Sequence, residues 1–505
     1  MTISNPLLLI ALPLIGSPLA YLAGRAARSA FLSRWTARLI LLLSWIPWIL
    51  LAQDVFEGNT VATVFTLQGL TLTFDGLSLL LSGATLFLST VVAFYSGSYI
   101  RGEDGEEKYY ALLLSLTGAI VGLGCATSLL SLWLWFELMS VSSLFLVAFY
   151  RKEQASLEAG VKYLVQSAAG SALVLFGIAL LFATTGTLTL PELPNALWGF
   201  SDRLPVLAAG ALFVIGFGVK AALVPLHTWL PDAHAQAPSG ISAMLSGVVI
   251  EAGLVALLRI LLPLEFLSGV WGPVLLVLGA LNMLVGNLLA LRQTQVKRLL
   301  AFSSLSHIGY MLLGIGAGMT FLQPAALSGG FFHLLTHMLM KGLAFLAAGA
   351  LLYALYVSRG HHAPLTVADL AGAAGKYPLV AGAFSVALLG LGGLPPLAGF
   401  MSKWQIFVGA AQTLNPWMIL LVAFAALNSV LSLAYYTPLV NAMYRREPSD
   451  AVRDGNSVPL SMSVPLAVLA AAILVLGFVP VLAAPLSLAA AKVFSILGGA
   501  LEMIR

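Results

Sequence analysis

Gly216-Phe-Gly-Val-Lys220-Ala-Ala-Leu-Val-Pro225-Leu-His227 interrupts an apolar segment twice, first with a lysine and then with a proline. A charged side chain at the bilayer centre costs roughly 2.5–3.5 kcal/mol on insertion scales. A proline inside a helix removes a backbone donor and clashes with the preceding turn. We therefore expect a transmembrane helix that breaks just past Lys220, with the freed backbone groups lining a wet cavity.

A second stretch, Gly392-Gly-Leu-Pro395-Pro396-Leu-Ala-Gly-Phe-Met-Ser-Lys403, repeats this arrangement in the other half of the chain. Two spans interrupted by Gly and Pro, one in each half, are typical of an inverted-repeat transporter. The alternative is a pair of ordinary proline kinks, which are common in membrane helices. The lysine beside each break favours the transporter.

The composition places the whole chain in a membrane. Of its 505 residues, 60% are hydrophobic and 9% are charged, against about 25% charged in soluble domains. Apolar stretches of about 20 residues recur from end to end, and each is long enough to span a ~30 Å hydrocarbon core. We expect an all-α polytopic membrane protein with about 14 transmembrane helices, forming a single transmembrane domain over residues 1–505. The first apolar run, Pro6 to Leu22, lacks a basic leader, so we expect no cleaved signal peptide.

The basic residues set the orientation. Seventeen of the 24 Lys and Arg fall on alternate loops, which predicts that these loops are cytoplasmic and that both termini lie on the opposite side. Arg259 is expected near a helix end, where its side chain can snorkel to the interface. Because the basic residues are spread over short loops, we expect no nucleic-acid partner. The single cysteine, Cys125, excludes an internal disulfide and a cysteine-held cluster.

Five ionisable residues fall in the middle of apolar runs: Glu137, Lys220, Glu251, Lys341 and Lys403. The default interpretation of such residues is a path for protons or ions. A Glu and a Lys within ~4–6 Å keep each other charged, so moving one charge changes the proton affinity of the next. The alternative is a static ion pair that fixes helix packing.

Histidines surround this set. His333, His337 and Lys341 are spaced i, i+4, i+8 and share one helix face, where they can hold a file of water and pass protons. The same spacing suits a metal, but no HExxH glutamate or third ligand is evident, so we expect no metal and no cofactor. His307, in Ser304-Leu-Ser-His307, either extends this chain or is an ordinary core histidine.

His227, Asp232 and His234 follow the first break. They form either a mouth through which protons enter from the cytoplasm or a hydrogen-bonded cap on the second half of the broken helix. The sequence leaves both interpretations open.

Several motifs resemble one superfamily: Val219-Lys-Ala-Ala-Leu-Val-Pro-Leu-His-Thr-Trp-Leu-Pro-Asp-Ala-His-Ala-Gln-Ala-Pro-Ser-Gly-Ile-Ser-Ala, Val296-Lys-Arg-Leu-Leu-Ala-Phe-Ser-Ser-Leu-Ser-His-Ile-Gly-Tyr, His333-Leu-Leu-Thr-His-Met-Leu-Met-Lys-Gly-Leu-Ala-Phe-Leu and Gly393-Leu-Pro-Pro-Leu-Ala-Gly-Phe. They are similar to the antiporter-like membrane subunits of respiratory complex I and of Mrp-type sodium/proton antiporters. The resemblance covers most of the chain.

The resemblance implies fourteen helices with broken seventh and twelfth helices and two inverted five-helix repeats, approximately 109–262 and 270–444. It implies that Glu137 pairs with Lys220, and that protons move laterally along Glu137, Lys220, Glu251, Lys341 and Lys403. One position departs from the pattern: Glu251 stands where the eighth helix usually carries a lysine, so its role is expected to differ.

The leading interpretation is a proton- or cation-translocating subunit of a multisubunit complex, similar to the D subunit of an Mrp Na+/H+ antiporter. Lys403 in place of a glutamate and the lack of a long C-terminal lateral helix favour this subtype. The alternatives are a proton-pumping membrane subunit of an NADH:quinone oxidoreductase or membrane-bound hydrogenase, a membrane subunit of an inorganic-carbon uptake system, and a non-transporting scaffold.

The expected partners are other membrane subunits, the lipid bilayer, protons and, for an antiporter, Na+. The expected location is the inner (plasma) membrane of the cell, as a multi-pass protein. Since the chain shows no redox site, any enzyme activity would belong to the complex.

Overall fold

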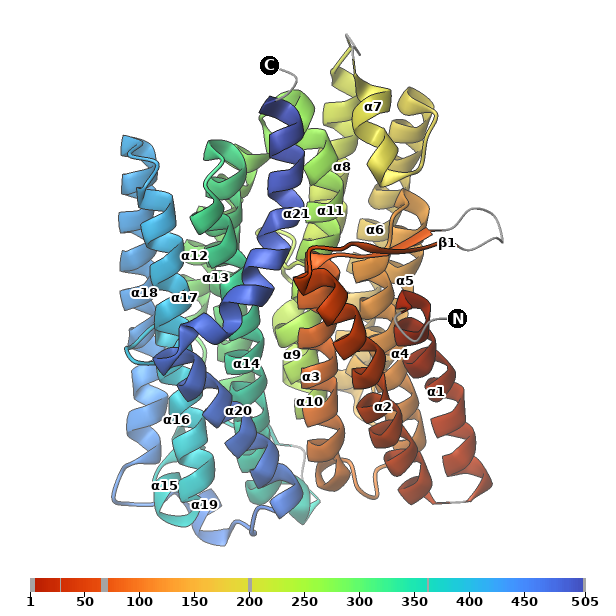
Figure 1. Ribbon diagram of the computed structural model, residues 1–505. Coiled ribbons are helices and arrows are strands. Elements are labelled where there is room, and N and C mark those ends of the chain that lie inside the picture. Colours follow the sequence, from red (N-terminus) through yellow and green to blue (C-terminus); the bar gives the residue numbers. More distant parts are fainter. Residues whose placement is uncertain (1–4, 28, 65–70, 199–201, 361–362, 503–505) are drawn as a thin grey trace.

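The computed structural model describes residues 5–27, 29–64, 71–198, 202–360 and 363–502. Most of its helices run side by side along one axis, with the N-terminal half (red to yellow) on one side of the bundle and the C-terminal half (green to blue) on the other (Figure 1). The protein is therefore a polytopic all-α membrane protein, as its composition predicted.

The helices of the N-terminal half are α1 (Pro6–Ala26), α2 (Ala30–Phe56), α3 (Gly76–Tyr99), α4 (Glu106–Cys125), α5 (Leu129–Val147), α6 (Gln154–Thr185), α7 (Leu193–Leu197), α8 (Leu204–Lys220), α9 (Leu230–Gln236), α10 (Ser239–Met244) and α11 (Ile250–Ser268). Those of the C-terminal half are α12 (Trp271–Ala290), α13 (Val296–Phe321), α14 (Pro324–Leu355), α15 (Ala373–Lys376), α16 (Pro378–Gly392), α17 (Ala398–Ala411), α18 (Pro416–Met443), α19 (Asp450–Asp454), α20 (Leu460–Phe478) and α21 (Ala484–Glu502).

Among the described residues, 11 helices are long and apolar enough to cross a membrane. One of them, Ser239–Leu264, joins α10 to α11 through a π-helical turn at Leu245–Val249. Three shorter apolar helices are also described: Pro480–Phe494, α8 and α16. Of these, α8 and α16 end at the Gly/Pro interruptions, which explains why they fall below that length. With these two and the 20-residue α4, the helices account for the number of spans that the sequence predicted.

The interior of the bundle lies around α13 and α14. All of the most apolar window of α13 is buried, as is 94% of that of α14, whereas 22% of that of α18 is buried. Glycines allow the close approach: a Cβ on Gly309 of α13 would lie 2.6 Å from the carbonyl oxygen of Gly279 of α12. Ionisable residues on α13 and α14 therefore lie far from lipid.

A small hairpin, β1 (Val61–Val64) and β2 (Thr71–Phe74), pairs antiparallel with Val61 opposite Phe74. It leads into α3, which begins with a capping box in which Asp75 and Ser78 bond each other's backbone N–H groups. In Figure 1, α7 lies at one end of the bundle and α15 and α19 lie at the other. The basic residues Lys376 and Arg453 belong to the second end, which the loop charges mark as cytoplasmic.

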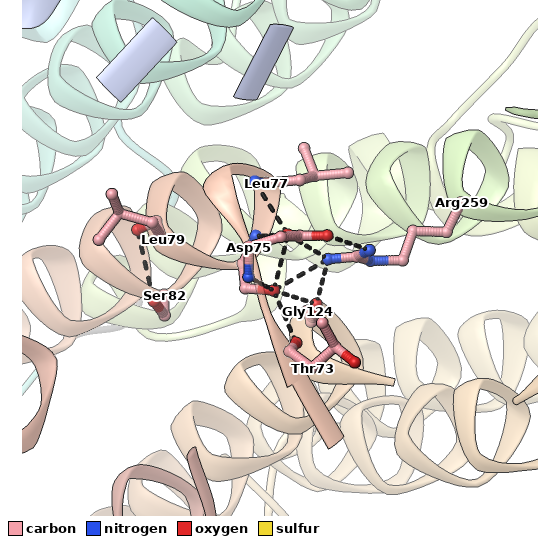
Figure 2. Close-up of polar contacts among 8 residues, drawn as sticks. Thr73, Asp75, Leu77, Leu79, Ser82, Gly124 and Arg259 are labelled. Carbon is pink, nitrogen blue, oxygen red and sulfur yellow. Dashed lines mark hydrogen bonds and ion pairs between the residues drawn. The ribbon is translucent and has the colours of Figure 1, made fainter. Parts of the chain in front are cut away.

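Arg259 corrects a sequence prediction. Its side chain does not snorkel to the interface but reaches from α11 to Asp75 at the start of α3, with both nitrogen–oxygen distances 2.8 Å (Figure 2). It also donates to the carbonyl oxygen of Gly124 at the end of α4. The two side chains are 10% and 13% exposed. An arginine fork matches a carboxylate in two parallel hydrogen bonds, so this pair ties three helices together near the outer end.

Candidate functional site

The first break follows Lys220, the last residue of α8, and the chain resumes helical structure only at α9. Pro225 lies within the interruption. Side chains satisfy freed backbone groups there: Trp229 Nε1 donates to the carbonyl oxygen of Val219 at 2.7 Å, and Asn282 Oδ1 accepts from Val224 N at 2.9 Å. The break is thus stabilised by protein partners at membrane depth.

Lys220 is fully buried and held by hydroxyl groups. Its ammonium donates to Tyr163 Oη at 2.7 Å and to Ser167 Oγ at 3.0 Å, both on α6. The Tyr163 hydroxyl lies 2.7 Å from Ser143 Oγ on α5. The ammonium also lies 4.1 Å from the centre of the Tyr163 ring, where the ring quadrupole attracts a cation.

Glu137 makes no ion pair with Lys220 in the part of the chain that the structure describes, although the resemblance implied one. This carboxyl group is half-buried on α5, and its Oε1 has no hydrogen-bond partner among the described residues. Neighbouring apolar side chains on α5 are open to the outside: Leu134 is 52% exposed, Val141 45% and Phe145 56%.

Glu251 meets His337 at the centre of the bundle. Glu251 Oε1 and His337 Nδ1 lie 2.8 Å apart, and both side chains are 0% exposed. Glu251 comes directly after the π-helical turn Leu245–Val249, and π-turns inside helices are frequent at functional sites. The remaining polar atoms, Glu251 Oε2 and His337 Nε2, lack partners among the described residues.

A histidine series continues from His337. The ring centroids of His337 and His307 lie 5.2 Å apart. His307 Nδ1 lies 3.0 Å from His333 Nε2, and His333 Nδ1 lies 2.9 Å from Ser402 Oγ. Ser402 precedes Lys403, so the series leads from Glu251 on α11 across α14 and α13 to the second lysine-bearing break.

Lys403 lies in α17, after the second break, whereas Lys220 lies before the first. Gly392 ends α16 and Pro395 and Pro396 occupy the gap before α17. The Lys403 ammonium donates to the carbonyl oxygen of Leu391 at 2.8 Å and to Ser429 Oγ at 2.9 Å. It thus caps a carbonyl oxygen that the break leaves free.

Lys341 shares α14 with the histidines but contacts another part of α13. It donates to the carbonyl oxygen of Leu300 at 2.8 Å and to Ser303 Oγ. His227 stands apart from the histidine series: it is 8% exposed, and its ring centroid lies 6.4 Å from that of Phe302.

Asp232 and His234 occupy different surroundings. Asp232 joins Lys162 of α6 at 2.9 Å and Arg298 of α13 at 2.5 Å. Burial acts to raise the pKa of this carboxyl, but its hydrogen bonds to Lys162 and Arg298 outweigh it and hold the pKa below its ordinary value. His234 is fully buried and stacks on Phe345 with ring centres 4.6 Å apart.

Sequence reasoning missed the hydroxyl groups that connect the charges: Ser143, Tyr163, Ser167, Ser402 and Ser429. Only Ser402 carried a local signal, its position next to Lys403. Within the described residues, no group of three His, Cys, Asp or Glu side chains has a geometry that could hold a metal ion.

The fold and the site define a polytopic membrane protein with buried ionisable and hydroxyl groups in its core. Residues 126–432 match the family model described as the membrane-spanning part of NADH:quinone oxidoreductase and Mrp antiporter subunits. The chain belongs to this family.

Among curated relatives, the F(420)H(2) dehydrogenase subunit N of Methanosarcina mazei is 34% identical over 396 residues, covering 77% of this chain and 78% of the relative. The NADH-quinone oxidoreductase subunit N of Desulforudis audaxviator is also 34% identical, covering 76% and 77%.

Solved structures share the fold over nearly the whole chain. A chain of the Mrp complex from Dietzia sp. has a TM-score of 0.86 at 25% identity, covering 97% of each chain. A chain of an archaeal membrane-bound sulfane sulfur reductase gives 0.86 at 28% identity, with the same coverage. A chain of respiratory complex I from Thermus thermophilus gives 0.76 at 28% identity, covering 95% of this chain and 99% of that one.

Proposed function

We propose that this chain is a proton-translocating membrane subunit of a redox-driven complex of the complex I type, corresponding to subunit N of its relatives. The observation that carries the proposal is the connected series Glu251–His337–His307–His333–Ser402 beside Lys403. Its members are proton donors and acceptors within contact of one another, buried where water is scarce. Such groups are expensive in a membrane, which argues against a scaffold.

The geometry suggests how a proton is handed on. Glu251 and His337 share one short contact, and each keeps a polar atom that has no partner among the described residues. An internal water needs two to four polar partners, and these atoms supply two. The His307–His333 contact then carries the proton to Ser402. Because Lys403 is a neighbouring cation in a low-dielectric interior, its charge raises the energy of a proton that arrives at Ser402.

Lys220 and Glu137 form the other end of the proposed path. Lys220 reaches α5 through Tyr163 and Ser143, while Glu137 is half-buried beside exposed apolar side chains. We propose that another membrane subunit covers Glu137, so that a charge change in that subunit alters the field at Lys220. Movement of Lys220 away from the Tyr163 hydroxyl would then connect the two lysine-bearing breaks.

The breaks also support the proposal of inverted repeats over about 109–262 and 270–444. Each proposed repeat contains one interrupted helix, α8/α9 or α16/α17, and one buried lysine beside the interruption. In transporters of this type, the site lies between the repeats. Here Glu251 from the first repeat meets His337 from the second.

The relatives favour a redox-driven complex over the Mrp antiporter that the sequence ranked first, since both bear the name subunit N of an oxidoreductase or dehydrogenase. Cation/proton antiport remains the second candidate, and the structural similarity to a chain of the Mrp complex supports it.

The test uses the native complex, purified in mild detergent and reconstituted into sealed vesicles. We expect acidification of the lumen when an electron donor and quinone or another acceptor are supplied, and its loss in the Glu251→Gln complex. Acidification that instead requires a sodium gradient and no electron donor would overturn the proposal in favour of antiport. Mass spectrometry of every co-purifying chain provides the independent check: iron–sulfur or quinone-binding subunits are expected.

A further inference from the structure

A pocket of about 530 Å³ opens between α1, α4 and the end of α5. Its lining includes Ser17 and Pro18 of α1, Leu112 of α4 and Phe145 of α5. The lining also includes two cations, Lys108 of α4 and Arg151 of the loop that follows α5. The lining therefore combines apolar side chains with two cations, and the pocket lies outside the proposed proton path.

The side chains of both cations pass close to Gly105. A Cβ built on Gly105 would lie 3.2 Å from Arg151 Nη2 and 3.5 Å from Lys108 Cδ. In the described part of the chain, neither Lys108 nor Arg151 forms a side-chain ion pair or hydrogen bond. Two cations that line one pocket without an anionic partner repel each other, and an anion between them would relieve that repulsion.

The position indicates which anion. Lys108 and Arg151 are on the loop set with the excess of basic residues, which marks the cytoplasmic face. The cytoplasmic leaflet carries the anionic lipids of the membrane, and basic residues at its surface attract them. Arg151 is six residues beyond Phe145, so the pocket extends from headgroup level toward the acyl chains.

We propose that this pocket binds an anionic glycerophospholipid. The phosphate lies between Lys108 and Arg151, the hydroxyls of Ser17 and Tyr21 face the ester region, and an acyl chain lies against Pro18, Leu112 and Phe145. A free phosphate ion would leave the apolar walls unused. An acidic segment of another subunit would match the cations but not the apolar side chains, so the lipid fits both parts of the site.

The experiment measures lipid binding to the purified native complex by native mass spectrometry, with phosphatidylglycerol, phosphatidylcholine or inorganic phosphate added. The double variant Lys108→Gln/Arg151→Gln is expected to bind phosphatidylglycerol roughly thirtyfold more weakly, because each cation near the surface contributes about fivefold. Phosphatidylcholine binding should be weaker in the wild type and should change little in the variant.

Two further variants keep the test sharp. Lys152→Gln removes an exposed cation next to Arg151 that does not line the pocket, and it should leave phosphatidylglycerol binding within about twofold of the wild type. Ser17→Leu fills the part of the pocket proposed for the ester region while keeping both cations, and it should also weaken lipid binding.

Three results would overturn the proposal. The first is equal phosphatidylglycerol binding by the double variant and the Lys152→Gln control. The second is displacement of the lipid by inorganic phosphate at equal concentration. The third is a cross-link from Lys108 to an acidic segment of another subunit in place of lipid. Because the readout is lipid occupancy, the outcome is independent of whether the complex pumps protons.

Discussion

Glu251 and His337 lie 2.8 Å apart, carboxyl oxygen to imidazole nitrogen, and both are wholly buried. They come from α11 and α14, on either side of the boundary between the two proposed repeats. Family resemblance implies a lysine at the place of Glu251, and a lysine can donate to the histidine but cannot accept from it. The carboxylate can accept from a protonated imidazole, so this pair can hold a proton between its members.

Glu251→Gln should abolish proton translocation while leaving assembly intact. Glutamine keeps the length and the hydrogen-bonding capacity of the side chain but has no titratable proton. We expect at least a tenfold fall in vesicle acidification per electron transferred, because a positioned proton-transfer group typically contributes at least this much to a rate. The acidification is measured with a pH-sensitive dye in reconstituted vesicles.

Glu251→Asp is the matched control for this prediction. It keeps the carboxyl group but shortens the side chain by one methylene, which moves the carboxyl group away from His337. Partial translocation is expected. Equal losses in the Gln and Asp variants would mean that the side chain serves packing rather than proton transfer.

Tyr163→Phe should lower translocation without removing any charge. The substitution deletes the hydroxyl that accepts from Lys220 at 2.7 Å and that contacts Ser143. A buried ammonium that loses one acceptor is destabilised by about 1–3 kcal/mol, so we expect a severalfold slower rate with a normal yield of complex.

Lys220→Ala should abolish translocation altogether, and Ser140→Ala serves as the control. Ser140 also lies on α5, but its hydroxyl donates to the carbonyl oxygen of Phe136 within its own helix and, among the described residues, to no other group. Full activity of the Lys220→Ala complex with normal assembly would remove this lysine from the path.

The sequence predicted those parts of the fold that depend on local composition. Apolar length predicts spans, and Gly and Pro predict breaks, because each acts on its own helix. Pairings between distant segments carried no such signal. Asp75 and Arg259 are 184 residues apart, and neither indicates the other.

The site was predictable to the same extent. Charges in an apolar run stand out, so Lys220, Glu251 and Lys403 could be predicted from the sequence as candidate site residues. Hydroxyl residues such as Tyr163 do not, because serine and tyrosine are common in membrane helices. The partner of Lys220 was therefore expected to be Glu137, whereas the structure gives it tyrosine and serine hydroxyls.

Asp75→Asn should impair assembly strongly. It leaves the Arg259 guanidinium buried with only neutral acceptors, and breaking a buried ion pair from one side costs about 3–5 kcal/mol. We expect a large fall in the yield of folded complex, measured by fluorescence-detected gel filtration.

The double variant Asp75→Leu/Arg259→Leu should recover part of that yield, since no unpaired charge remains. Glu57→Gln, at an exposed position, should have no effect. A normal yield from Asp75→Asn would show that the pair contributes little.

Asp232→Asn should lower thermal stability in a pH-dependent manner. Asp232 bonds Lys162 and Arg298, and these partners hold the pKa of its carboxyl below the ordinary 3.8. A depressed pKa gives stability that is fully present above the ordinary pKa and is lost as the pH falls through the lower, folded value. At pH 7 we expect a loss of about 1 kcal/mol, since the three side chains are partly exposed and solvent screens them. The melting temperatures of wild type and variant should converge below about pH 4.

Glu158→Gln is the control. It removes the exposed contact with Lys162 and should change the melting temperature less at every pH. A gap between wild type and Asp232→Asn that stays constant down to pH 3 would mean that the variant acts through shape, not through charge.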